Sequence, residues 1–202
     1  MFDGGCRMSR IIAGLAGGHA LASVPGSGTR PTTDRVKEAL FSRLEAMDVL
    51  TGARVLDLYA GSGALGLESL SRGASSAELV EADAKAAAIC QRNAELLNCL
   101  AGPGAARVNR AKVEQFLQRS AGPWDLVFLD PPYPLEESGL SSVLETLAPR
   151  LAAGAVVVVE RSVRSPEPDW PAGLASFSHR SYGETRLWFA EPAVAEGASV
   201  ND

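Results

Sequence analysis

The sequence has few cysteines, few histidines and no long hydrophobic run. Only three of its 202 residues are cysteine and two are histidine. Because Cys6, Cys90 and Cys99 are odd in number and lack metal-ligand or CxxC spacing, neither a disulfide framework nor a zinc site is expected. Apolar runs such as 155–159 are far too short to cross a bilayer, and no signal-peptide pattern opens the chain. We therefore expect a cytoplasmic protein with no membrane partner and no metal.

Several catalytic motifs are also missing. The sequence contains no GxSxG, no HExxH and no Walker lysine in its glycine-rich loop. We interpret the two histidines, His19 and His179, as surface or packing residues rather than as general bases. The usual hydrolase, metallopeptidase and nucleotidase sites are therefore not expected.

The composition indicates one soluble globular domain, with 46% hydrophobic and 21% charged residues. The net charge of −5 argues against a nucleic-acid partner, but the charge is unevenly distributed. Residues 1–43 carry six basic side chains against three acidic ones. The amino-terminal arm, not the body, would then face nucleic acid, and a solvated, mildly basic surface is the alternative. The six basic residues are Arg7, Arg10, Arg30, Arg35, Lys37 and Arg43.

The order of sequence patterns predicts a doubly wound α/β fold. Residues 1–31, rich in glycine, serine and proline, read as an extended arm with one hairpin, and an amphipathic helix follows Asp34. From residue 51, apolar runs alternate with helical patterns, which indicates a mostly parallel sheet covered on both faces. We divide the chain into an arm and helix (1–50), an α/β domain (51–190) and a tail (191–202). The expected strands are 54–59, 77–81, 105–109, 124–129 and 155–160, and the expected helices are 64–71, 84–97, 113–119 and 137–151.

The alternation of strand and helix patterns stops near the end of the chain. Residues 174–180 and 184–190 are two strand candidates with no helix between them. A direct connection of this kind predicts an antiparallel hairpin at the edge of the sheet.

The glycine-rich loop follows the first expected strand. Gly61, Gly63 and Gly66 match GxGxxG, but glycines alone do not name a ligand. Asp57 lies four residues before Gly61 and would face an ammonium group, which favours S-adenosylmethionine over a dinucleotide. A helix-capping or turn aspartate is the alternative. Glu81 ends the second strand, where a carboxylate accepts hydrogen bonds from ribose hydroxyls.

A second loop, Asp130-Pro131-Pro132-Tyr133, follows the strand 124–129. In open α/β sheets such a loop faces the same crevice as the glycines. Asp130 and the Pro131 carbonyl would accept hydrogen bonds from an exocyclic base amine, and proline rigidity would hold these acceptors in place. Tyr133 would offer a flat surface to a base taken out of its stack. A proline-stiffened turn with an incidental aromatic is the alternative.

With these motifs the sequence resembles the amino-methylating class I methyltransferases. The segment 30–41 (RPTTDRVKEALF) is similar to the arm and first helix of the bacterial 16S rRNA (guanine(966)-N(2))-methyltransferase family, and the similarity runs from about Arg10 to Leu187. The resemblance implies a seven-stranded sheet ending in two antiparallel strands, and methyl transfer from S-adenosylmethionine to guanine N2 of small-subunit rRNA within an assembly particle. We expect the enzyme to be a monomer.

Carried over by position, the resemblance assigns three groups of residues. Asp130, Pro131, Pro132 and Tyr133 would hold the guanine, and Arg10, His19, Arg30 and Arg35 would contact RNA. The cofactor would be lined by Asp57, Tyr59, Ala60, Gly61, Ser62, Gly63, Glu81, Ala82, Val113, Arg30, Thr32 and Thr33. Two departures from the family pattern bear on this assignment. The arm has Gly17-Gly18-His19 in place of a basic cluster, and Lys112 occupies the place of an Asn or Asp near the adenine.

Other functions remain as alternatives. A DNA adenine-N6 methyltransferase would use the same loop but normally needs a target-recognition region, and a methyltransferase acting on proteins or small molecules would not need Tyr133 and the basic arm. An NAD-binding oxidoreductase would explain only the glycines, and a non-catalytic RNA-binding module would explain only the arm. Because residues 1–7 have no pattern of their own, we also hypothesise that Met8 is the natural initiator.

Overall fold

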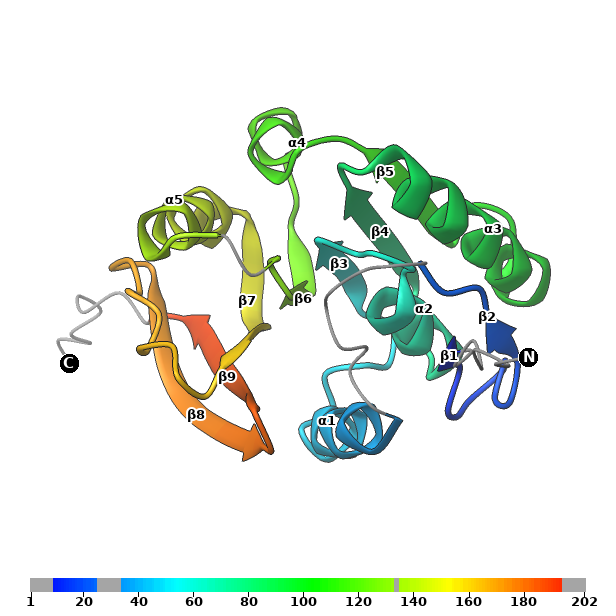
Figure 1. The fold of residues 1–202 in the computed structure, drawn as a ribbon, viewed down its shortest axis with the longest axis horizontal. Coiled ribbons are helices and arrows are strands. Elements are labelled where there is room, and N and C mark those ends of the chain that lie inside the picture. The colour runs from blue at the N-terminus through cyan, green and yellow to red at the C-terminus, as the bar shows by residue number, and fades with distance from the viewer. Residues whose placement is uncertain (1–8, 25–33, 133–134, 194–202) are drawn as a thin grey trace, which may run out of the picture.

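The computed structural model describes residues 9–24, 34–132 and 135–193. Within these ranges the chain forms one seven-stranded sheet flanked by helices and one small two-stranded sheet (Figure 1). Some residues singled out in the sequence lie outside the described residues, namely Met8, Arg30, Thr32, Thr33 and Tyr133.

The large sheet has the order β5-β4-β3-β6-β7-β9-β8. Strands β3 to β7 are parallel to one another, whereas β9 is antiparallel to both β7 and β8. The predicted doubly wound sheet and its terminal hairpin are thereby confirmed. The strands are β3 (Arg54–Leu58), β4 (Ser76–Glu81), β5 (Ala106–Arg110), β6 (Trp124–Leu129), β7 (Leu151–Ser162), β8 (Leu174–Tyr182) and β9 (Thr185–Pro192).

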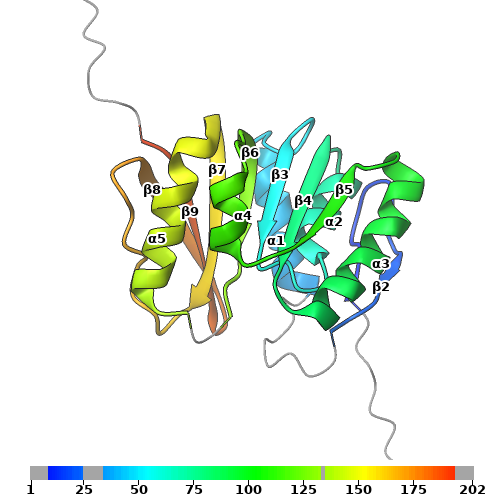
Figure 2. The same cartoon turned by 90° about the horizontal axis from the view of Figure 1, so that it is seen from above.

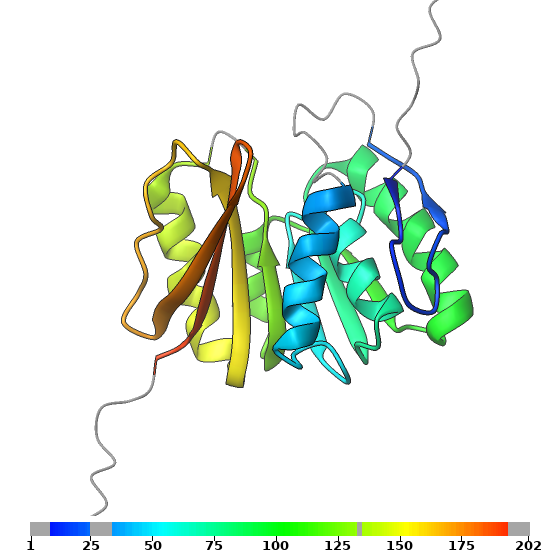
Figure 3. The same ribbon diagram turned by 90° about the horizontal axis from the view of Figure 1, so that it is seen from below.

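Helices cover both faces of this sheet (Figures 2 and 3). One face packs against α1 (Asp34–Ala46), α2 (Ala64–Ser71) and α3 (Ala84–Ala101). The other face packs against α4 (Val113–Arg119) and α5 (Glu137–Leu147). Since side chains alternate along a strand, a sheet covered on both faces needs apolar residues at consecutive positions. That is why the central strands read as continuous hydrophobic runs. Among the described helices, none is long and apolar enough to cross a membrane.

Several predicted boundaries were wrong; the helix expected over 84–97, for example, continues to Ala101. The helix expected over 137–151 ends at Leu147 and passes into a 3-10 turn, Ala148–Arg150. Pro149 lies in that turn, where it has no amide hydrogen to continue the helix. Strand β7 consequently begins at Leu151 and continues to Ser162, two residues beyond the predicted end.

The amino-terminal segment lies against the body. Its strands β1 (Ser9–Arg10) and β2 (Ala20–Leu21) form the predicted hairpin, drawn in dark blue at the right of Figure 3. Ile11, Ala16 and Leu21 are completely buried and belong to the same core as α1 and α2. The hairpin therefore packs as part of the fold and does not project from it as an extended arm.

Candidate functional site

The two predicted motifs meet at the carboxyl edge of the central strands. In register, Leu58 pairs with Val80 on one side and with Leu129 on the other, and Leu129 pairs with Val159. The next residue on each strand therefore lies at the same level across four neighbouring strands. These four residues are Tyr59, Glu81, Asp130 and Glu160.

The turn after β3 has a constrained backbone. Tyr59 has φ 64°, an uncommon value for a residue with a side chain, and Gly61 (56°) and Gly63 (82°) follow it with positive φ. The Ala60 amide donates to the carbonyl of Val80 at 2.9 Å, which holds the turn against β4. A side chain on Gly61 would meet nothing within 4 Å, so that position faces open space.

The third glycine of the motif serves packing instead. A Cβ on Gly66 would lie 2.3 Å from Leu79 Cδ2 and 3.2 Å from Asp57 Cβ. Helix α2 can approach β3 and β4 this closely only because Gly66 has no side chain.

Asp57 lies beneath this turn, 2% exposed. Its Oδ2 accepts a hydrogen bond from the Gly66 amide at 2.9 Å, so it satisfies a donor in the first turn of α2. Burial, opposed by that hydrogen bond and assisted by the charge of Glu81, raises the pKa of Asp57 to about 7. The helix-capping alternative therefore describes a real contact of Asp57. The role of Asp57 toward a cofactor stays a prediction.

Glu81 organises the backbone around it. One carboxylate oxygen accepts from the Gly61 amide at 2.9 Å and the other from the Asp83 amide at 2.8 Å. A carboxylate has about four acceptor positions, so Glu81 can still accept from ligand hydroxyls. Ala82, the next residue, is exposed. The Val113 side chain is buried under α4, which leaves only its backbone for a ligand.

Asp130 is the acid that begins the second loop. Burial raises its pKa well above the usual range, and the negative charges of Glu160 and Asp57 raise it further. Pro131 is buried beside it, whereas Pro132 is exposed and its carbonyl accepts from the Leu135 amide at 2.9 Å. The structure therefore brings Asp57, Glu81 and Asp130 together, as predicted from the sequence.

A cavity of about 270 Å³ lies at the opposite edge of the sheet, where the same strands begin. Its lining includes Arg54, Glu78, Arg107 and Trp124. We assign the candidate site to the carboxyl edge nevertheless, because ligands of open α/β sheets bind there and both motifs meet there.

The residues predicted to contact RNA differ in their surroundings. Arg10 is exposed and pairs with Asp34 at 3.1 Å. His19 is exposed, with Nδ1 2.9 Å from the Ala16 carbonyl of its own turn. Arg35 is exposed at the start of α1. The contacts of these three residues with RNA remain predictions.

The chain is similar to known proteins in both sequence and structure. Residues 9–191 match the model of the family described as Conserved hypothetical protein 95. The chain belongs to this family. Within it, the chain is 36% identical to Ribosomal RNA small subunit methyltransferase D of Escherichia coli K12, over 96% of this chain and 94% of that protein. It is 40% identical to the protein of the same name from Haemophilus influenzae, over 67% of this chain and 70% of the relative.

A solved structure supports the same fold. The Escherichia coli protein yhhF, which carries a methyltransferase name, superimposes with a TM-score of 0.78 at 33% identity, covering 92% of this chain and 98% of that one. This chain thus has the class I methyltransferase architecture.

Two residues near the site were missed by the sequence analysis. Glu160 ends an apolar run just as Glu81 does, and that signal could have identified it. Asn93, 4% exposed on α3, holds the arm against the glycine turn. Its side-chain Oδ1 accepts a hydrogen bond from the backbone N–H of Ala22 at 2.9 Å. Its Nδ2 donates to the backbone carbonyls of Ala22 at 3.0 Å and Ser62 at 2.9 Å. A polar residue at a core position of a helical pattern was the available signal.

Proposed function

We propose that this chain transfers a methyl group from S-adenosylmethionine to the exocyclic N2 of a guanine in 16S rRNA. The observation that carries the proposal is the placement of Glu81 and Asp130 at one level on either side of the glycine turn. A nucleoside-binding carboxylate and an acceptor for a base amine then share one crevice. The family relatives that carry an rRNA methyltransferase name support the choice of substrate.

The residues present fit S-adenosylmethionine on their own chemistry. When bound, this molecule supplies the methyl group and carries positive charge on its sulfonium and ammonium groups. Glu81 offers free acceptor positions to ribose hydroxyls, and the open space at Gly61 admits a ligand against the backbone. Burial raises the pKa values of Asp57 and Asp130, and the charges of neighbouring carboxylates raise them further; a cationic ligand would oppose both effects by favouring the ionised carboxylates.

Asp130 would act on the base amine. The nitrogen lone pair of guanine N2 is delocalised into the ring, and hydrogen bonds from its N–H groups to Asp130 and to the Pro131 carbonyl would localise it. Because burial and neighbouring charges raise the pKa of Asp130, its carboxylate is a stronger base than an exposed aspartate. It would take the proton that the nitrogen loses once the new N–C bond has formed.

Three finer points belong to the same proposal. The substrate would be an assembling small-subunit particle in the cytoplasm, because an acidic chain of net charge −5 needs an additional binding surface to hold RNA. The enzyme would act as a monomer. Arg10, His19 and Arg35 would contact the RNA, together with Arg30, which lies outside the described residues.

The test is methyl transfer from labelled S-adenosylmethionine to unmodified small ribosomal subunits, with naked rRNA and DNA in parallel, followed by nucleoside analysis. We expect N2-methylguanosine from the subunits. N6-methyladenine from the DNA would favour the DNA methyltransferase alternative, and absence of transfer to any substrate would refute the proposal.

A further inference from the structure

Strand β7 extends past the end of its neighbour β6. Strand β6 stops at Leu129, which pairs with Val159, but β7 continues for three more residues to Ser162. There it still pairs with β9, since Ser162 lies opposite Thr185. At about 3.3 Å per residue this extension is about 10 Å long. The end of the β7-β9-β8 unit therefore forms a ledge beside Asp130.

Three arginines lie on this ledge, and we call them the hairpin rim: Arg164, Arg180 and Arg186. Arg186 is the second residue of β9 and Arg180 lies near the end of β8, on either side of the turn at Gly183. Because Arg180 lies opposite Leu187, the two arginines lie on opposite faces of the sheet at this edge. The Val163 amide donates to the Glu184 carbonyl at 2.9 Å, which places exposed Arg164 next to the same turn.

The contacts of Arg180 and Arg186 in the hairpin rim are with uncharged groups. Arg180 donates to the His179 carbonyl at 2.8 Å, and Arg186 donates to Ser181 Oγ at 3.2 Å while lying over the Trp188 ring. None of the three guanidinium groups forms an ion pair with a described residue.

A neighbouring arginine shows the contrast. Arg161 lies directly opposite Arg186 in the sheet, and like charges at opposed positions destabilise a strand pair. Arg161 is neutralised by an ion pair with Glu137, whereas Arg186 keeps its charge available. The ledge therefore carries positive charge beside the site of a chain whose net charge is −5.

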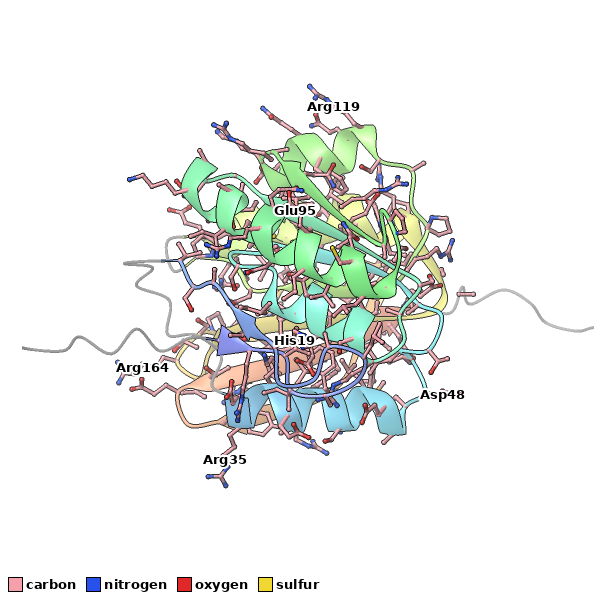
Figure 4. All side chains as sticks on the ribbon, turned by 90° about the vertical axis from the view of Figure 1, so that its right-hand side faces the viewer. His19, Arg35, Asp48, Glu95, Arg119 and Arg164 are labelled. Atoms are coloured by element: carbon pink, nitrogen blue, oxygen red, sulfur yellow. The ribbon has the colours of Figure 1, made fainter. Side chains whose placement is uncertain are left out.

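We infer that the hairpin rim binds phosphate groups of the rRNA next to the target nucleotide, an inference that rests on the proposed function. Guanidinium groups pair with phosphates through two parallel hydrogen bonds. Figure 4 shows Arg164 at the same end of the molecule as Arg35, opposite Asp48. RNA entering the crevice would thus meet cations on α1 and on the ledge. Because base specificity lies in the crevice, these contacts position the RNA without reading its sequence.

The experiment compares Arg164→Gln/Arg180→Gln/Arg186→Gln with the wild type, using unmodified small subunits, naked 16S rRNA and a series of salt concentrations. We expect KM for both RNA substrates to rise about tenfold or more, with kcat unchanged at saturation. The dependence of log KM on log salt should become shallower by about 2, since each single-strand phosphate contact contributes about 0.7. Arg119→Gln, an exposed arginine of α4 far from Arg164 in Figure 4, is the matched control and should behave as wild type.

A second variant guards against misfolding, because Arg186 packs over Trp188. Arg164→Gln/Arg180→Gln leaves that contact in place and should give about two thirds of the slope change, with thermal unfolding and S-adenosylmethionine binding as in the wild type. Wild-type KM and salt dependence in this double variant would overturn the inference. So would an effect on subunits alone, since it would indicate a ribosomal-protein partner. Inactivity of the wild type itself would instead count against the proposed function.

Discussion

Lys37 and Glu68 form an ion pair that is almost completely shielded from water. Nζ of Lys37 lies 3.6 Å from Oε2 of Glu68, and the two side chains are 2% and 0% exposed. Glu68 also pairs with Arg72 at 2.7 Å and accepts the amides of Ile12 at 2.7 Å and Ala13 at 3.1 Å. Lys37 in turn donates to the Arg10 carbonyl. One carboxylate therefore joins α1, α2 and the amino-terminal hairpin.

Glu68→Gln should destabilise the fold strongly. The variant keeps the shape of the side chain but removes the negative charge beside the buried Lys37, which costs roughly 3–5 kcal/mol, whereas Arg72 keeps its ion pairs with Glu38 and Glu45. Chemical denaturation measures the free energy of unfolding. Glu95→Gln, an exposed helix position labelled in Figure 4, is the control and should change it by less than about 0.5 kcal/mol. Equal stability of the two variants would contradict the prediction.

Asn93→Leu should weaken both the fold and cofactor binding. It removes three hydrogen bonds and leaves partly buried backbone groups of Ala22 and Ser62 without these partners, at a cost of about 2–3 kcal/mol. Because Ser62 belongs to the glycine turn, affinity for S-adenosylmethionine should fall as well. Calorimetric titration and denaturation measure the two effects. Gln91→Ala, on the exposed side of the same helix, should leave both unchanged.

Asp57→Asn should remove a pH dependence of stability. The folded-state pKa of Asp57 is raised to about 7, whereas an unfolded aspartate titrates near 3.8. Between these values the folded state holds a proton that the unfolded state has lost, so stability falls as pH rises from about 4 to about 7. We expect the wild type to lose more stability than Asp57→Asn over this range, by denaturation at each pH. Parallel curves would show that Asp57 does not titrate as described.

Asp130→Asn should abolish methyl transfer while sparing cofactor binding. Loss of a positioned base costs roughly 10²–10⁴-fold in kcat. Single-turnover transfer and calorimetric titration with S-adenosylmethionine measure the two quantities. Asp48→Asn, at an exposed position with φ 54° that asparagine tolerates, is the control. Full activity of Asp130→Asn would exclude the proposed role of this carboxylate.

Glu160→Gln should shift the pH profile of the reaction. The charge of Glu160 helps raise the pKa of Asp130, so its removal should lower that pKa. The acid limb of kcat/KM would then move to lower pH, because Asp130 would stay ionised further into the acid range. A limb that stays in place, or moves to higher pH, would show that Glu160 does not act on Asp130.

Much of the fold could be predicted from local pattern. The continuous apolar runs of β3 and β6 predicted a sheet buried on both faces, and Gly61 and Gly63 predicted the turn that follows β3. The edge hairpin followed from two strand patterns with no helix between them. Such features depend on residues close together in the chain, and that is why sequence alone can reveal them.

The surroundings of the charged residues could not be predicted from local sequence pattern. Lys37 counted toward a basic arm in the sequence, but the fold buries it against Glu68, 31 positions away, and so removes its charge from the surface. Arg43 lies over the Phe189 ring, 4.7 Å from its centroid. No sequence pattern singled out Arg186. It joins a cationic ledge only because β7 extends beyond the end of β6.

The sequence by itself determined the α/β architecture, the strand that carries Asp57, the glycine turn after it and the loop that carries Asp130. Only the tertiary structure decided that Glu160 joins these acids, that Asn93 ties the hairpin to Ser62, and which cations stay exposed. The physical reason is range. Backbone conformation and hydrophobic periodicity are set within a few residues, whereas the protonation and pairing of a charge depend on every group that the fold brings within a few ångströms of it.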